Sequence, residues 1–175
     1  MPAAANPFWH FSLRAWRVPG VQAACLALQE HRGADVNLLL FCGWTGREGR
    51  ELDRRDLRQA IGCVGNWQNE VIAPLRLARR GLKHQRAGTP AAALAPTFRD
   101  RFLALELALE QAEQALLADL AAQWAPVGHD ASPRQAVAAN LDCYLELLTK
   151  PAGPEEPAHL AQIVEACSAA QRRAA

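Results

Sequence analysis

The sequence predicts an all-α protein, a single-domain bundle of six to seven helices in which the third helix is buried at the centre. Two observations lead to this fold class. No segment keeps up the alternation of apolar and polar residues that a half-buried strand needs. Capping residues (Asn, Asp, Thr or Ser) instead recur ahead of apolar residues at helical spacing, in two places with proline directly after the cap. A chain of 175 residues has about the length of one domain and can bury its own core.

The first part of the chain predicts three helices, over residues 8–17, 19–32 and 36–46. The third carries an apolar run from Val36 to Cys42 that leaves no polar face. Such a run also fits a buried strand. Asp35 in the capping position and the lack of a partner strand favour a helix, and a helix that is apolar all round should be enclosed by the others.

The rest of the chain predicts three or four further helices, separated by prolines and glycines. Their expected ranges are 54–84, which Pro74 should kink or divide, and 98–124, 133–149 and 156–172. Residues 86–96 are expected to form an internal loop, the best candidate for a mobile segment. The single domain should therefore span 6–172, between a disordered tail at 1–5 and a tail at 173–175.

The helix expected over 98–124 is the longest and has a nearly heptad apolar pattern, which predicts packing along one seam. Its seam positions are Phe98, Phe102, Leu105, Leu109, Ala112, Leu116 and Leu120. Glu106, Glu110 and Glu113 are expected to lie off that seam.

Cysteine usage and hydropathy favour a cytoplasmic protein without a membrane segment. Five cysteines, an odd number without a C-x-x-C pair, predict small core residues in a reducing compartment and neither a disulfide framework nor a metal site. The most apolar stretch, 36–44, is shorter than the roughly 20 residues that span a bilayer. The start of the chain lacks the features of a signal peptide.

Positive charge collects in the middle of the chain. Residues 47–86 hold ten of the nineteen cations and only five acids, although the whole chain has a net charge of +1. Four of these cations line one face of a short helix at about residues 75–84, and they are Arg76, Arg79, Arg80 and Lys83. This face is able to bind phosphates or an acidic protein surface. Alternatively, it pairs inside the fold with the glutamates of the longest helix.

A second candidate site follows the third helix, where three glycines stand beside Trp44, Arg47 and Arg50. A glycine-rich turn with arginines is able to cradle an anion, but the P-loop pattern is absent, and a helix C-cap with a turn explains it equally. Trp9, Trp44 and Trp67 are candidate walls of a ligand pocket, against the alternative that each packs in the core.

Known catalytic and metal-binding patterns are absent from the sequence. No histidine pair has H-E-x-x-H spacing, no G-x-S-x-G elbow exists, and the paired acids do not fall on an inward face. We therefore expect no catalytic residue, metal or cofactor, and regard an enzyme as the less favoured hypothesis.

Three segments resemble those of a proteobacterial family of small all-helical proteins catalogued as a domain of unknown function. They are NPFWHFSL at 6–13, GADVNLLLFCGW at 33–44 and WQNEVIAPLRLARRGLK at 67–83, and the resemblance covers roughly residues 6–150. It implies no activity or ligand. It draws attention to the residues in or next to these segments, which are Trp44, Arg47, Trp67, Arg76, Arg79, Arg80 and Lys83.

The leading functional hypothesis is a non-enzymatic adaptor or regulatory protein that binds an acidic or phosphate-bearing partner through the basic face at 75–84, extended by Arg47 and Arg50. A protein partner is favoured over nucleic acid, because nucleic-acid binders are usually basic overall. The alternative is a small-molecule-binding protein or enzyme with a pocket lined by tryptophan and arginine. A third hypothesis is a homodimer through the helix at 98–124.

Overall fold

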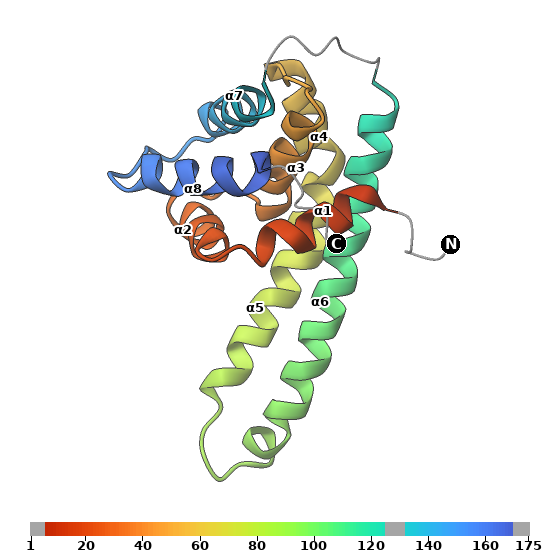
Figure 1. Ribbon diagram of the computed structural model, residues 1–175. Coiled ribbons are helices and arrows are strands. Elements are labelled where there is room, and N and C mark those ends of the chain that lie inside the picture. The colour runs from red at the N-terminus through yellow and green to blue at the C-terminus, as the bar shows by residue number, and fades with distance from the viewer. Residues whose placement is uncertain (1–5, 125–131, 170–175) are drawn as a thin grey trace, which may run out of the picture.

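The computed structural model describes residues 6–124 and 132–169, and within these ranges every regular element is helical (Figure 1). The α-helices are α1 (Pro7–Trp16), α2 (Val21–Arg32), α3 (Val36–Arg47), α4 (Arg54–Trp67), α5 (Ala73–Gly81), α6 (Pro90–Ala122), α7 (Pro133–Glu146) and α8 (Glu156–Ser168). A π-helical turn (Gln68–Ile72) joins α4 to α5, and a 3₁₀ turn (Leu82–His84) follows α5. The predicted all-α fold class is confirmed. Because α4 and α5 run on through the π turn, the described residues form seven continuous helical segments.

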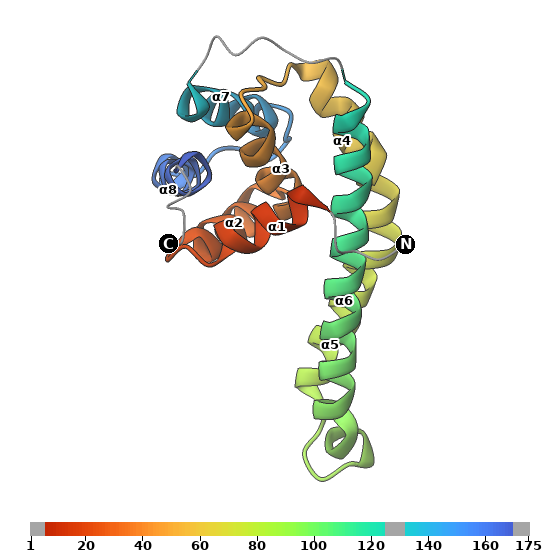
Figure 2. The ribbon, with the colours of Figure 1, turned by 45° about the vertical axis from the view of Figure 1, so that its right-hand side comes forward.

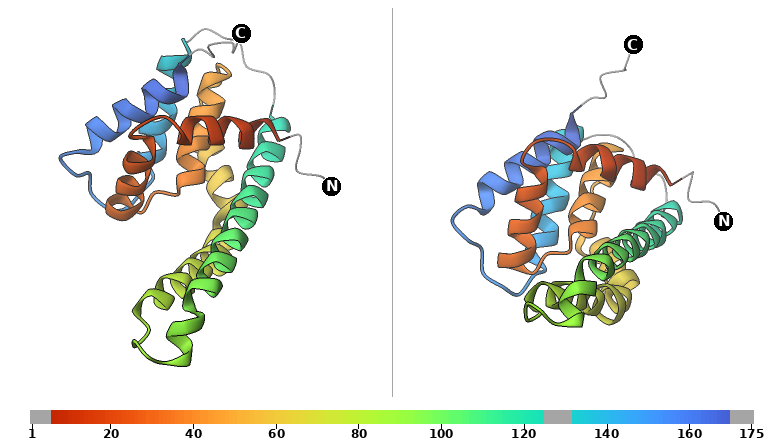
Figure 3. Two further views of the ribbon diagram at one scale, coloured as in Figure 1. Left: turned by 60° about the horizontal axis from the view of Figure 1, so that its bottom comes forward. Right: turned by 90° about the horizontal axis from the view of Figure 1, so that it is seen from below.

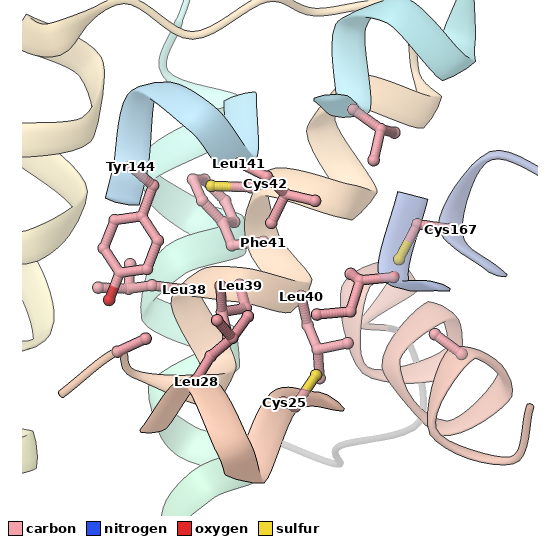
Figure 4. Close-up of a cluster of buried hydrophobic side chains, with 14 of the residues drawn as sticks. Cys25, Leu28, Leu38, Leu39, Leu40, Phe41, Cys42, Leu141, Tyr144 and Cys167 are labelled. Carbon is pink, nitrogen blue, oxygen red and sulfur yellow. The ribbon is translucent and has the colours of Figure 1, made fainter. Parts of the chain in front are cut away.

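Helix α3 lies at the centre of the body, as predicted. Asp35 caps it by accepting a hydrogen bond from the backbone N–H of Asn37, and every residue from Asn37 to Gly43 is buried. Helices α1, α2, α6, α7 and α8 all pack against α3. Figure 4 shows its leucines and Phe41 among side chains of α2, α7 and α8. The apolar run without a polar face therefore marks a helix covered on all sides.

Helix α7 packs most closely on α3, and two glycines of α3 allow the close approach of its neighbours. A Cβ on Gly46 would lie 2.6 Å from Val137 Cα, and a Cβ on Gly43 would lie 2.6 Å from Cys167 Sγ of α8. Asn140 of α7 joins α7 to the loop after α3, since its amide donates to Arg50 O (2.9 Å) and accepts from Leu52 N (2.6 Å). Glycine thus serves helix packing here.

Helices α5 and α6 form an antiparallel arm that extends well beyond the body (Figures 1 and 2). The upper half of α6 packs against α1, α3 and α4, while its lower half has only α5 and the 3₁₀ turn beside it. Seen from below, the arm projects past α1, α2 and α3 toward the viewer (Figure 3). The arm consequently has a much larger share of exposed surface than the body.

Pro74 stands in the first turn of α5, and the predicted interruption takes the form of the π turn directly before this helix. Ala73 N donates to Gln68 O, a hydrogen bond one residue longer than the α-helical one. Proline has no N–H and its ring crowds the preceding turn, so widening that turn by one residue relieves the strain. The predicted stripe of 54–84 therefore remains one helical rod.

The predicted loop at 86–96 is wrong for most of its length. Helix α6 already begins at Pro90, capped by the Thr89 side chain, which accepts from Ala92 N at 3.2 Å. Pro96 lies inside the helix, six residues after its start. In the sequence, Pro96 followed by Thr97 has the pattern of a helix breaker followed by a new N-cap, which predicts a helix start at residue 98. Thr89-Pro90, eight residues earlier, is an N-cap followed by proline, and the helix starts there instead.

The predicted seam of α6 is only half covered, and the glutamates face inward. Phe102, Leu109 and Leu120 are half-buried against α4 and α5, whereas Phe98, Leu105 and Leu116 on the other edge of the seam are exposed. Glu106 and Glu113 are buried and Glu110 is half-buried, which contradicts their predicted position off the packed face. The physical reason is that Arg76 and Arg79 of α5 and Asn37 of α3 provide partners for these carboxyls.

Three of the five cysteines match the prediction of core residues. Cys25, Cys42 and Cys167 are buried, and burial raises the pKa of Cys25 and Cys167 to about 12. Cys63 is exposed and Cys143 is half-buried, so the prediction was wrong for Cys63. All five are free thiols. The predicted tails at 1–5 and 173–175, the turn at 125–131 and the last residues of the helix expected at 156–172 lie outside the described residues.

Candidate functional site

The predicted basic stripe lies on α5 and the 3₁₀ turn after it, and two of its four cations are engaged inside the fold. Arg79 binds Glu106 with both arms of its guanidinium, Nε to Oε1 at 2.6 Å and Nη2 to Oε2 at 3.0 Å. Arg76 donates from Nη2 to Glu110 Oε1 at 2.8 Å and lies 4.0 Å from Glu106. Internal pairing with the long helix therefore describes Arg76 and Arg79.

Arg80 and Lys83 form the other half of the stripe, and both are exposed. Neither side chain has an ion pair or hydrogen bond within the described parts of the chain. Their charges are consequently available to a partner, and we call these two residues the arm cations.

Behind the ion pairs lies a carboxyl pair, the buried Glu113 of α6 and the half-buried Asp35 at the start of α3, where the arm meets the body. Glu113 is fully buried, and Asn37 Nδ2 donates to its Oε2 at 2.9 Å while Gln114 Nε2 donates to Asn37 Oδ1 at 2.7 Å. Burial, followed by the nearby Asp35 carboxylate, raises the pKa of Glu113 to about 9. Burial also raises the pKa of Asp35. At neutral pH Glu113 is therefore a neutral acid.

The ion pairs of the arm shift the pKa values of their members in directions that follow from burial and pairing. Burial raises the pKa of Glu110, and Arg76 opposes that rise. The hydrogen bond to Glu106 raises the pKa of Arg79. The two helices of the arm are thus joined to each other by partly desolvated ion pairs.

A cleft of about 750 Å³ lies between α2 and the α5 side of the arm. Its lining residues are Leu26, Gln29, Glu30, Gly33, Ala34, Asp35, Gln68, Asn69, Ala73, Arg76, Leu77 and Arg80. Leu26 and Leu77 are exposed apolar side chains, and Leu77 is 71% exposed. Gln68, in the π turn, has a buried Oε1 without a hydrogen-bond partner in the described structure. The cleft therefore combines charged side chains of both signs, amides and apolar contact area.

The cluster at the end of α3 forms a separate site in the body. Trp44 stacks on Phe8 with ring centroids 5.2 Å apart, and with Arg50 it lines a mostly apolar pocket of about 740 Å³. Arg50 Nη2 pairs with Asp56 at 3.2 Å, and its guanidinium lies 4.5 Å from the centre of the Trp124 ring. Arg50 is thus held in place by a carboxylate and an aromatic face.

The glycine-rich segment beside this pocket does not form an anion cradle. Gly43 and Gly46 belong to α3 and contact α8 and α7, and Gly49 alone of the three adopts a left-handed conformation, with φ 81°. Arg47 lies half-buried, 6.0 Å from the centre of the Phe11 ring. The interpretation as a helix end followed by a turn is therefore the one that describes these residues.

The three tryptophans considered as pocket walls do not share one pocket. Trp67 donates from Nε1 to Leu109 O at 3.1 Å and thereby packs α4 onto α6. Trp44 lines the pocket next to Arg50, whereas Trp9 and Trp67 do not belong to its lining.

Sequence reasoning misses the carboxyl pair and the exposed leucines of the arm. It identifies Asp35 only as a helix cap, and it places Glu113 on the wrong side of its helix. A usable signal does exist: Glu106, Glu110 and Glu113 fall at the same 4-3 spacing as the seam, so they form a second stripe that also needs a partner surface.

Two general features of the described residues bear on function. No group of three or more histidine, cysteine or acidic side chains within them has the geometry to hold a metal ion. None of the helices in residues 6–124 and 132–169 has the length and hydropathy required to cross a membrane.

Fold and site together define a helical protein whose body carries a protruding, charged arm. A family model described as "Protein of unknown function (DUF2390)" matches residues 7–117, and the chain belongs to this family. The matched residues run from α1 into the last turns of α6 and include the whole stripe and the carboxyl pair. The match ends before α7, earlier than the expected limit near residue 150. Neither a curated protein nor a solved structure matches the chain.

Proposed function

We propose that this chain is a non-catalytic adaptor or regulatory protein that binds an acidic or phosphate-bearing partner through its arm. The observation that carries the proposal is the division of the basic stripe. Arg76 and Arg79 join α5 to α6 within the arm, and the arm cations Arg80 and Lys83 stay exposed without an ion pair among the described residues. A rigid helix that presents unpaired cations suits the recognition of an anionic surface.

The surroundings of Arg80 favour a protein as the partner. The cleft beside Arg80 has exposed leucines, Leu26 and Leu77, on its walls. Protein interfaces use such apolar contacts in addition to charge, whereas nucleic-acid binding is supplied mainly by phosphate contacts. The net charge of +1 points the same way, because nucleic-acid binders are usually basic overall.

The proposal is tested by affinity capture from a lysate of the cells that naturally make this protein. The bait is the wild-type chain, and the test variant is R80E/K83E, which reverses only the unpaired charges and leaves the buried glutamates with their arginines. R55E/R58E is the matched control, because Arg55 and Arg58 have the same i, i+3 spacing on α4 and are also exposed. We expect partners that are lost with R80E/K83E and kept with R55E/R58E. Equal capture by all three baits would contradict the proposal.

A second candidate function, the binding of a small molecule, rests on the pocket next to Trp44 and Arg50. Its volume of about 740 Å³ lies in the range of ligand pockets, and its lining is mostly apolar, with the cation Arg50 and the acids Glu48 and Asp119. Thermal-shift screening with small aromatic acids tests this function. A stabilising compound should lose its effect in W44A but not in W67F, and the absence of any such compound would count against the pocket.

The proposal also includes a cytoplasmic location and a function that does not involve catalysis. They agree with free thiols in the described chain and with the lack of catalytic motifs in the sequence.

A further inference from the structure

Helix α6 leaves one edge of its apolar seam uncovered over most of its length. The exposed fractions of the side chains on this edge are 54% for Leu94, 41% for Phe98, 49% for Leu105 and 42% for Leu116. These residues, with Ala112, lie within about a quarter-turn of one another on the helix. Because α4 and α5 cover only the other edge, the helix retains a long apolar stripe that faces away from its own fold.

The surface next to this stripe is hollow and built from small residues. The pocket of about 740 Å³ has Ala108, Ala112 and Ala115 of α6 on one side and Pro7 and Trp44 on the other. Leucines that stand out beside a row of alanines form a surface of knobs and holes. Two such surfaces pack closely when the leucines and alanines of the two copies interdigitate.

The charges that flank the stripe fix how two copies would align. Arg101 and Asp119 are both exposed and stand eighteen positions apart, which is about five helical turns, so they lie on the same side of the stripe. In an antiparallel pair of α6 helices centred between residues 110 and 111, each Arg101 comes within one position of the second copy's Asp119. The same alignment sets Leu105 against the second copy's Leu116 and Leu109 against its Ala112. Charge and apolar spacing thus agree on one register.

We propose that two copies of this chain associate through α6 in this antiparallel arrangement. A second copy fits better than an unrelated partner because the surface is complementary to itself: in a twofold pair each contact occurs twice, and here both apolar and charged positions satisfy that condition. The arm cations take no part in this contact. The proposal therefore stands independently of the proposed function.

The test is sedimentation velocity of the full chain over a range of concentrations, for the wild type and four variants. L105E places a charge in the stripe, R101D and D119R each set like charges opposite one another, and R101D/D119R exchanges the two charges. R58D is the matched control, an exposed arginine on α4 away from the stripe. Circular dichroism of every variant checks that the helical fold is retained.

We expect a dimer for the wild type and for R58D, and dissociation constants raised about tenfold or more for L105E and for each single charge reversal. The double exchange R101D/D119R should recover most of the affinity, since it restores opposite charges across the interface. A wild type that remains monomeric at its highest soluble concentration would overturn the proposal. So would a dimer that L105E leaves intact, or a double exchange that dimerises more weakly than either single variant.

Discussion

Glu113 is the residue whose chemistry departs most from that of a free side chain. Its side chain has no exposed surface, and its carboxyl group lies between Asn37 and Asp35. A buried carboxylate without a cation is costly, so the group retains its proton. The arginines that join α5 to α6 already pair with Glu106 and Glu110, which leaves Glu113 to be satisfied by protonation.

The protonation of Glu113 predicts stability that falls as the pH rises. In the unfolded chain Glu113 ionises near the ordinary glutamate pKa of 4.5, whereas in the folded chain its pKa is about 9. Between these values the unfolded state releases a proton that the folded state keeps, so the free energy of unfolding should drop by up to about 1.4 kcal/mol per pH unit. Urea unfolding at pH values from about 5 to 9 measures the slope.

Glu113→Gln should flatten this profile. Glutamine cannot ionise, its amide is able to donate toward Asp35, and its carbonyl accepts from Asn37. Glu51→Gln is the control, because Glu51 is exposed and should leave the slope unchanged. Parallel profiles for the wild type and Glu113→Gln would show that Glu113 ionises normally in the folded protein.

The two kinds of arginine on α5 should respond differently to truncation. Arg79→Ala leaves the buried Glu106 without its forked partner and should lower the free energy of unfolding by about 2 kcal/mol or more. Arg80→Ala removes an exposed side chain and should change it by no more than about 0.5 kcal/mol. Chemical denaturation of both variants provides the comparison, and equal losses would refute the division of the stripe.

At the residue scale, the sequence predicts caps well and buried charge poorly. Asn6, Asp35 and Asp53 each cap a helix, and such caps can be recognised locally because they depend on neighbours two or three positions away. The burial of Glu106 depends on Arg79, which lies twenty-seven positions earlier in a different helix. Local patterns contain no information about that pairing.

Among the elements, α3 and α7 show how glycine sets the distance between helices. Gly46→Ala puts a methyl group 2.6 Å from the backbone of Val137, so the helices must separate or shift, and we expect a loss of about 2 kcal/mol or more in stability. Gly62→Ala is the matched change in α4, where a Cβ meets nothing within 4 Å. It should stabilise the protein by about 0.5–1 kcal/mol. Thermal unfolding distinguishes them, and a neutral Gly46→Ala would contradict the close packing.

Helix boundaries can be predicted where a segment contains a single cap-and-proline signal. The prediction fails where a segment contains two such signals. α1 and α7 begin at their asparagine- and serine-capped prolines, Pro7 and Pro133. The sequence of α6 contains two such start signals. The helix begins at the earlier one, Thr89-Pro90, because its first turns then lie alongside α5 and the 3₁₀ turn. Tertiary packing decides between two local signals of similar strength.

At the scale of the whole molecule, the all-α class and the central α3 follow from the sequence, and the arm does not. An apolar run without a polar face must be covered, whatever covers it. The sequences of α5 and α6 look like those of ordinary amphipathic helices, so they do not indicate a protruding hairpin. Only the three-dimensional arrangement shows that the outer faces of these two helices meet no other helix of the described body (Figure 2).

The central claim is that the arm cations Arg80 and Lys83, and not their paired neighbours, form an anion-binding surface. The most direct measurement is a fluorescence-anisotropy titration of the wild type, R80E/K83E and R55E/R58E with labelled polyglutamate and labelled single-stranded RNA, each at low and moderate salt. We predict binding that weakens with salt, is abolished in R80E/K83E and persists in R55E/R58E. Stronger binding of polyglutamate would favour an acidic protein partner, and stronger binding of RNA a phosphate-bearing one. Binding of neither probe at low salt, or undiminished binding by R80E/K83E, would contradict the claim.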